Sequence, residues 1–345
     1  MTTKAPDNAF RLMLLLLILL LPILLLGNLF IGSVHIPAAD IVDILLGRDG
    51  VTEVWQNIVL SYRVPQAVTA AVSGAALAVA GLLMQTLFRN ALADPSILGI
   101  SSGASLSVAI VMLCFGGSVG QMLSISVSRS ILVILAAFIG SMAVMAVVIW
   151  FSTRVRNNVM LLIIGIMIGY LSSSVIYVLN FYASSDNIRH FVFWSMGNYS
   201  NVVAERLPFF CITVALGLLG ASLLIKPLNA LLLGENYAVN LGVRLKRVRI
   251  AILAVTGLLT STVTAFCGPI AFIGLAVPHI ARLLSRCSNH RQLMPLVILT
   301  GAVISLGCNL CTLLPSNGSI LPVNTITPIV GAPVVLYIIL HRQHI

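Results

Sequence analysis

Few side chains in this sequence could do covalent or redox chemistry. Cys308 and Cys311 have the spacing of a redox or metal-binding pair, but they lie in an apolar run, whereas redox motifs of this spacing belong to a βαβ unit. We interpret them as two small residues on one face of a membrane helix. No Ser, His and Asp combination and no cluster of metal ligands stands out, so the sequence predicts neither an enzyme nor a permanently bound metal or cofactor.

The lysines exclude nucleotide binding by a P-loop in this chain. That motif places Lys directly after Gly, where the lysine and the loop backbone hold the phosphates. The chain has only Lys4, Lys226 and Lys246, and none of them follows a glycine. If transport is driven by ATP, the nucleotide and its Mg²⁺ must therefore be bound by a separate subunit.

One histidine and three methionines could contact a cargo. His190 lies in the polar and aromatic stretch 183–205 and could ligate a haem iron in transit; a surface histidine is the alternative. Met160, Met167 and Met196, with the aromatic residues near them, could line a path for a bulky and partly apolar molecule. Ordinary helix packing is the alternative for each of them.

Composition places these residues in a membrane. The chain is 59% hydrophobic and 8% charged over 345 residues, whereas soluble domains carry about 25% charged residues. A soluble protein with a very large core is disfavoured because charge-free runs of bilayer-spanning length recur. The runs are continuously apolar, which favours helices over a β-barrel. The net charge of +10 fits the cations of cytoplasmic loops and does not require nucleic acid.

The apolar runs predict an all-α polytopic membrane protein of one domain, residues 1–345, with about ten spans and both termini cytoplasmic. Lys4 and Arg11 precede the first run, which lacks a signal-peptide cleavage site. The span 64–88 is rich in Ala and Gly, so we expect an interior helix. The predicted spans are 12–32, 64–88, 95–115, 130–153, 157–182, 207–225, 250–266, 270–284, 293–314 and 323–340.

No charged pair falls inside a predicted span. Ion-coupled carriers and proton pumps depend on intramembrane ionisable residues. His279, after Pro278, is the only candidate, and we expect it at the cytoplasmic end of a helix. The alternative of a stand-alone secondary carrier for a small molecule is therefore disfavoured, and uptake that persists without an ATPase would favour it.

One charged stretch, 234–250, interrupts the apolar sequence with one carboxylate and four cations. We predict two short cytoplasmic helices within 227–243. Asn229 caps the first and Gly234 ends it; Glu235 opens the second, where a carboxylate suits the helix dipole, and Gly242 ends it in a left-handed turn. Ala238 and Leu241 would be apolar contacts for a partner protein. The cations either contact lipid phosphates or bind that partner.

Several segments combine small residues with Pro and Arg at fixed places: Arg63-Val-Pro65, Ser73-Gly-Ala-Ala-Leu-Ala-Val-Ala-Gly-Leu-Leu-Met-Gln85, Asn90-Ala-Leu-Ala-Asp-Pro-Ser-Ile-Leu-Gly99, Gly234-Glu235 with Leu241-Gly242, Phe272-Ile-Gly-Leu-Ala-Val-Pro-His-Ile-Ala-Arg-Leu283, Leu321-Pro-Val323 and Gly331-Ala-Pro333. Together they resemble the FecCD family over nearly the whole chain, its cobalamin-importing members above all. These proteins are permease subunits of ATP-binding-cassette (ABC) importers for iron siderophores, haem and cobalamin.

The resemblance implies a homodimeric permease of the bacterial inner membrane. Each copy would dock one of two ATPase subunits through Gly234, Glu235, Ala238, Leu241 and Gly242, and a periplasmic or lipid-anchored binding protein would deliver the cargo. The path would run between the copies, lined by the second, third, fifth, eighth and tenth helices. The fifth helix and the short helix after it would gate the path, and the candidate residues on the fifth helix are Gly165, Met167, Gly169, Ser172 and Ser173.

Two departures from the family pattern concern the outer surface. Arg63 is kept, but Gln66 stands where cobalamin permeases carry a second arginine. A further Arg-bearing stretch is replaced by 311–319, and Asn324 stands where Gly is usual. Such arginines are thought to meet carboxylates of the binding protein, so docking should depend less on charge here. Arg63 remains the docking candidate, and Arg63→Glu should weaken uptake.

Overall fold

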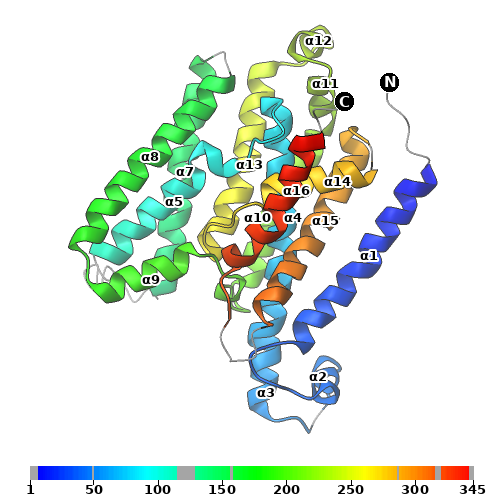
Figure 1. Cartoon of the computed structure of the whole chain (residues 1–345), viewed down its shortest axis with the longest axis vertical. Helices are drawn as coiled ribbons and strands as arrows, with labels where there is room; N and C mark the ends of the chain where they lie inside the picture. The colour runs from blue at the N-terminus through cyan, green and yellow to red at the C-terminus, as the bar shows by residue number, and fades with distance from the viewer. Residues whose placement is uncertain are drawn as a thin grey trace.

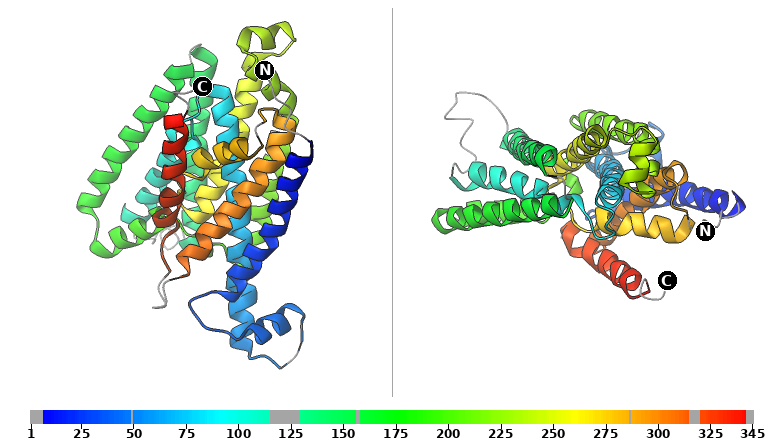
Figure 2. Two further views of the ribbon diagram at one scale, coloured as in Figure 1. Left: turned by 45° about the vertical axis from the view of Figure 1, so that its right-hand side comes forward. Right: turned by 90° about the horizontal axis from the view of Figure 1, so that it is seen from above.

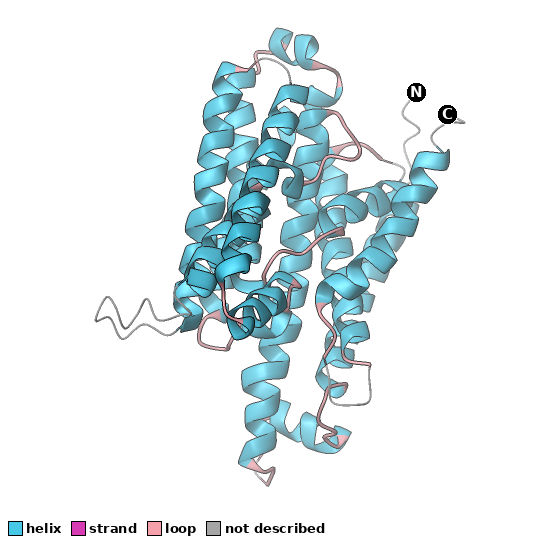
Figure 3. Cartoon of the chain, turned by 60° about the vertical axis from the view of Figure 1, so that its left-hand side comes forward, coloured by secondary structure: helices cyan, strands magenta, loops and turns pink. Residues whose placement is uncertain are grey.

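The computed structural model describes residues 7–48, 50–114, 129–155, 158–285, 287–314 and 320–341. All regular structure in these ranges is helical (Figures 1 and 3). Residues 115 and 157, at predicted span ends, and 315–319 lie outside the described residues. The elements are α1 (Asp7–Phe30), α2 (Ala38–Leu45), α3 (Glu53–Asn57), η1 (Ile58–Arg63), α4 (Val64–Phe88), η2 (Pro95–Leu98), α5 (Ile100–Ala109), η3 (Ile110–Cys114), α7 (Arg129–Arg154), α8 (Asn158–Tyr182), α9 (Ser185–Ser195), η4 (Tyr199–Asn201), α10 (Leu207–Leu223), α11 (Ile225–Leu232), α12 (Glu235–Asn240), α13 (Leu245–Cys267), α14 (Ile273–Ser285), α15 (His290–Thr312) and α16 (Val323–His341).

Six described helices are long and apolar enough to cross a membrane, and α10 and α11, which are bent by 50° at the break between them, pass the same test only when taken together. Three shorter apolar helices cover Ile100–Cys114, Ile273–Ser285 and Val323–Tyr337. A helix therefore lies at each predicted span, while the count of ten and the sidedness of the termini stay predictions. The start of α1, the end of α16 and the α11–α12 segment all lie at one end of the bundle (Figure 1).

The helix α4 is the centre of the bundle, and α10, α13, α14 and α15 pack around it (Figures 1 and 2). It is buried on every side along nearly its whole length. A methyl group on Gly74 would overlap the carbonyl of Gly301 in α15, and one on Gly81 would overlap the carbonyl of Gly274 in α14. Small residues thus bring the backbones into contact, and the prediction of an interior helix is confirmed.

The continuous helix that contains α4 begins earlier than the sequence predicted. Apolar sequence suggested a start at Val64, but one continuous helix runs over Glu53–Phe88. Pro65 lacks an N–H and would interrupt an ordinary α-helix. The π-helical segment η1 directly before Pro65 changes the hydrogen-bond pattern there, so the chain passes the proline without a break. The segment before it forms α2 and α3 around a small separate core of Ile36, Ile41, Ile44 and Val59.

The helices α1 and α8 lie at opposite edges of the bundle when it is viewed from above (Figure 2). Only 17% of each spanning window is buried within this chain. Their exposed side chains are mostly Leu, Ile, Val, Met, Phe and Tyr. Such apolar faces belong against lipid or against another protein chain.

Candidate functional site

The α11–α12 segment stands out from the end of the bundle that also carries both termini (Figure 1). Gly234, with φ +113°, starts α12, and Gly242, with φ +84°, follows it. Both backbones lie in the region that residues with a Cβ avoid. The two helices and the two glycine boundaries therefore agree with the sequence prediction.

The exposed surface of α12 differs from the expected one. Ala238 was predicted as a contact for a partner, but its exposed fraction is 0%. Its carbonyl accepts a hydrogen bond from the N–H of Val243 at 3.0 Å, which closes the turn. Tyr237, Val239 and Leu241 are exposed by 51%, 51% and 59%. We call these three residues the apolar tip.

The sequence missed Tyr237 and Val239 because it read one helical period through the whole stretch. Ala238, Leu241, Leu245 and Val248 share a face only in an unbroken helix. The break at Gly242 resets the register, so the face of α12 is not continuous with that of α13. Leu241 lies before this break, at the end of α12, and is exposed, so it keeps its predicted place.

The cations of this stretch do not act as one group. The Arg249 guanidinium lies 3.7 Å from the Glu235 carboxylate, and the Arg249 side chain is only 12% exposed. It also donates a hydrogen bond to the Val155 carbonyl after α7 at 3.2 Å. Arg249 therefore ties α12 to the bundle, whereas Arg244, Lys246 and Arg247 are exposed.

Asn229 was predicted to cap α11, and this prediction is wrong because Asn229 lies inside that helix. Its amide oxygen accepts hydrogen bonds from His290 at the start of α15, and its amide nitrogen donates to Asn289. The side chain thus joins two elements. A cap assignment considers only neighbours in sequence, and these partners are about sixty residues away.

Arg63 is buried, with 6% of its surface exposed. Its guanidinium donates to the carbonyls of Leu29, at 2.7 Å, and Val34. It lies over Gly32, where a Cβ would be 2.8 Å from the guanidinium carbon. Arg63 thus satisfies carbonyls at and just after the end of α1 and is not presented on the surface of the chain. The docking role assigned to it stays a prediction.

Gln66, the position of the missing second arginine, belongs to a buried polar group. Its amide donates to the Asn309 side chain at 3.1 Å, and Asn309 donates to Asn28 at 2.7 Å. Asn28 in turn donates to the backbone carbonyls of Leu24 and Leu306. These three amides connect α1, α4 and α15 inside the bundle, and nothing in the apolar pattern predicted them.

The path candidates on α8 face two ways. Gly165 packs on η2, since a Cβ there would lie 2.6 Å from the Leu98 Cα, and Ser172 is buried. Gly169 faces Ser102 of α5, where a Cβ would lie 3.4 Å from the hydroxyl. Met167 is on the other side of the helix and is 54% exposed.

A small hydroxyl-rich cavity of about 260 Å³ lies between α5, α8 and α9. Ser173 lines it together with Ser101, Ser102, Ser105, Ile176, Tyr177 and Phe191. Of the five path candidates on α8, Ser173 is the one that opens into this space. The exposed face of the same helix carries Met160, Met167, Tyr170 and Tyr177.

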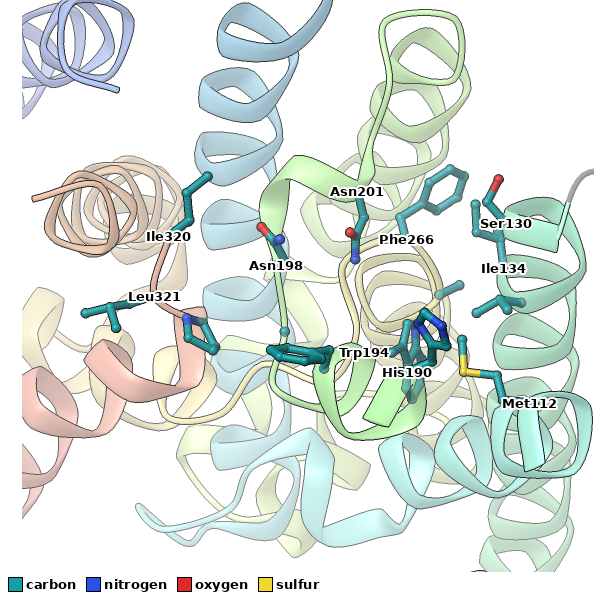
Figure 4. A pocket seen from close by; sticks show the side chains of 15 residues that line it. Met112, Ser130, Ile134, His190, Trp194, Asn198, Asn201, Phe266, Ile320 and Leu321 are labelled. Carbon is teal, nitrogen blue, oxygen red and sulfur yellow. The ribbon is translucent and has the colours of Figure 1, made fainter. Parts of the chain in front are cut away.

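A cavity of about 550 Å³ lies beside α9 (Figure 4). Phe193, Trp194 and Phe266 give it aromatic walls, and His190 and Met112 lie together at one side. His190 therefore lies in the helix α9 and lines a cavity. The cavity is formed within one copy of the chain.

Long apolar helices around a small-residue core, with a short helical projection at one end, define a polytopic membrane protein of the permease class. The chain belongs to the FecCD transport family, whose profile matches residues 17–341. It is therefore a multi-pass ABC importer permease and not an enzyme, and ATP hydrolysis lies in a partner ATPase.

Individual relatives support the assignment over most of the chain. The vitamin B12 import system permease protein of Klebsiella pneumoniae is 33% identical, with 86% of this chain and 85% of that protein covered. The hemin transport system permease protein of Yersinia pestis is 34% identical, with 86% and 85% covered. A metal-chelate type ABC transporter solved in an inward-facing conformation superposes with a TM-score of 0.79 at 27% identity, covering 95% of this chain and 98% of that one.

Proposed function

We propose that this chain moves an iron chelate, haem or cobalamin across the bacterial inner membrane as a homodimer. Two ATPase subunits dock on the cytoplasmic side, and a periplasmic or lipid-anchored binding protein delivers the cargo outside. The observation that carries the proposal is the apolar tip. It is an exposed apolar surface on a segment that projects from the helix bundle, and this member of the FecCD family has no P-loop sequence of its own.

The ATPase contact is made by the apolar tip, seated in a groove of the partner. Tyr237 and Leu241 are one helical turn apart and lie on one face of the segment. Gly234 and Gly242 set its angle, Glu235 is held by Arg249, and Ala238 supports it from within. An aromatic and an aliphatic anchor on a short helix suit a helix-in-groove interface.

The path is formed where the exposed faces of α8 from two copies meet. Tyr170 and Tyr177 place hydroxyl groups on that face, and Met160 and Met167 add flexible apolar surface. Lipid gives such hydroxyls no partner in the bilayer core, whereas a cargo with polar edges does. A bulky cargo with apolar and hydrogen-bonding parts fits this lining.

An experiment on the apolar tip tests the ATPase contact. Leu241→Asp puts a charge into the proposed interface, and we expect the ATPase to be lost on co-purification, together with cargo-stimulated hydrolysis. Leu46→Asp is the matched control, because Leu46 is similarly exposed, at 61%, but lies beyond α2 at the opposite end of the chain's fold. Equal ATPase recovery with both variants would contradict the proposal.

The cargo is identified by transport. The permease, reconstituted in vesicles with its ATPase and binding protein, should take up one of labelled haem, ferric siderophore or cobalamin in an ATP-dependent manner. Uptake of a cargo without the ATPase would show a secondary carrier instead.

A further inference from the structure

His290 joins three helices at the end of the bundle next to α12. It is the first residue of α15 and only 1% of its surface is exposed. Its backbone N–H and its ring Nδ1 both meet the Asn229 amide oxygen in α11, at 2.8 and 2.9 Å. Its ring Nε2 lies 2.9 Å from the Thr86 hydroxyl in α4. One imidazole therefore bridges the segment that carries the apolar tip and the central helix.

The surrounding hydrogen bonds fix the protonation pattern of this bridge. A backbone N–H can only donate, so the Asn229 atom that it meets is the acceptor oxygen. The amide nitrogen of Asn229 then donates to Asn289 at 2.9 Å, as the geometry shows. Because Nδ1 meets the same oxygen, it must carry a proton. In the neutral ring Nε2 is then an acceptor, and the Thr86 hydroxyl lies 2.9 Å from it and 2.8 Å from the Leu82 carbonyl, so its single proton is shared between these two acceptors.

The end of α4 is held from other sides by a second set of contacts. Gln85, beside Thr86, accepts a hydrogen bond from Arg282 at 2.7 Å and donates to the Leu275 carbonyl of α14 at 3.1 Å. His279 of α14 bonds to the carbonyl of Ala91 at 2.6 Å. The turn after α4 then leads into η2, which packs on Gly165 of α8. A displacement of the α4 end therefore meets α14 and α8 directly.

Within the described residues, the other side-chain hydrogen bond of α11 runs from Asn229 to Asn289, which leads to α15 and not to α4. The helix α11 follows α10 after a 50° bend and is followed by Gly234, so both of its chain connections are hinge-like. Leu228 and Leu231 bury its apolar side, but apolar contact is non-directional and allows sliding. Hydrogen bonds require a narrow range of distance and angle. The Asn229–His290–Thr86 bridge is thus the directional attachment of α11 to the centre of the bundle.

We propose that His290 is a positioning residue for transport: it makes α11 and the cytoplasmic end of α4 move as one body. Movement that the ATPase imposes on the apolar tip then reaches the central helix instead of being absorbed by the bend before α11. This inference depends on the proposed ATPase contact at α12.

Two matched variants each remove one link of the bridge. His290→Asn keeps a donor near the Nδ1 position and loses the contact with Thr86. Thr86→Val removes the same contact from the other side with little change in volume. Because the net contribution of a buried hydrogen bond corresponds to about a two- to tenfold change in an equilibrium constant, each variant should lower the cargo moved per ATP hydrolysed by about two- to tenfold. The double variant should be no worse than either single one.

The measurements distinguish a role of His290 in coupling from a purely structural role and from a role in binding the ATPase. Each variant is reconstituted as the full complex, and ATPase recovery, ATP hydrolysis, cargo uptake and apparent melting temperature are measured. The proposal expects normal ATPase recovery, continued hydrolysis and fewer cargo molecules per ATP. His35→Asn, at an exposed outer histidine, is the control and should behave as the parent.

Two outcomes overturn the inference. A lower melting temperature with an unchanged cargo-to-ATP ratio makes His290 structural, and loss of the ATPase from the His290 and Thr86 variants makes it part of the docking surface. Normal ATPase recovery with Leu241→Asp is a separate result. It removes the proposed contact at α12, whatever the His290 variants do.

Discussion

Replacing Arg63 by Met distinguishes a buried anchor of α1 from a docking residue for the binding protein. Met keeps the length and much of the volume of the side chain but removes every donor. In the structure the guanidinium bonds to the Leu29 carbonyl at 2.7 Å and to the Val34 carbonyl, with a longer contact to Phe30 at 3.4 Å. The change therefore leaves carbonyls at the end of α1 without their partner.

The magnitude follows from the two short bonds. Hydrogen bonds to a charged donor contribute about 1.5–3 kcal/mol each. Water at this end of α1 can replace part of them, so we use the lower figure for each of the two bonds and expect a loss of about 3 kcal/mol. At about 2 °C per kcal/mol for a large domain, the apparent melting temperature should fall by about 6 °C. Arg48, whose side chain is 65% exposed and pairs with Asp43 at 3.0 Å, is the matched control, since surface pairs contribute at most about 1 kcal/mol.

The assay measures thermal unfolding of the purified permease in lipid nanodiscs, followed by binding of the binding protein to the same samples. We expect Arg63→Met to lower the melting temperature, Arg48→Met to leave it nearly unchanged, and both to bind the binding protein below their melting temperatures. An Arg63→Met protein with the parental melting temperature and lost binding would refute the anchor and support the docking role.

Two further changes test other parts of the fold. Gly242→Ala should lower the free energy of unfolding by about 1–2 kcal/mol because φ is +84° there, and it should weaken ATPase recovery. Gly307→Ala is the control. No neighbouring atom lies within 4 Å of the methyl group that it adds, so it should leave both stability and ATPase recovery unchanged. Asn309→Leu leaves Gln66 and Asn28 without a shared partner, so the melting temperature should fall by the equivalent of about 1 kcal/mol. Changing Asn28 to Leu as well should recover part of that loss, and a further fall would contradict this account of the amide group.

The helices and the α11–α12 segment were predictable because their signals are local. Lipid requires long charge-free runs, and the two glycines of α12 mark turns that few other residues tolerate. The register of the apolar tip was not predictable in the same way. It depends on whether one helical period continues through Gly242, and the pattern of Ala238 and Leu245 looked the same in either case.

The polar contacts were not predictable because each depends on a partner that is distant in sequence. An arginine at the end of a span, such as Arg63, can point outward or back to the preceding helix, and only the position of α1 decides between them. Thr86 and His290 are separated by 204 residues, and Gln66 and Asn309 by 243. In a sequence dominated by apolar residues, nothing marks such pairs before the helices are placed.

The length of the central helix gives it the geometry of a lever. Its 36 residues extend over about 54 Å at 1.5 Å per residue, well beyond the hydrocarbon layer of about 30 Å. The backbones touch where Gly74 meets Gly301, with the side chains of Ala78 and Ser305 beside the contact, so this close approach can serve as a fulcrum. From there the arm to Thr86 measures about 18 Å and the arm to Glu53 about 32 Å. A rocking motion of about 1 Å at Thr86 would thus swing the Glu53 end by about 1.8 Å in the opposite direction.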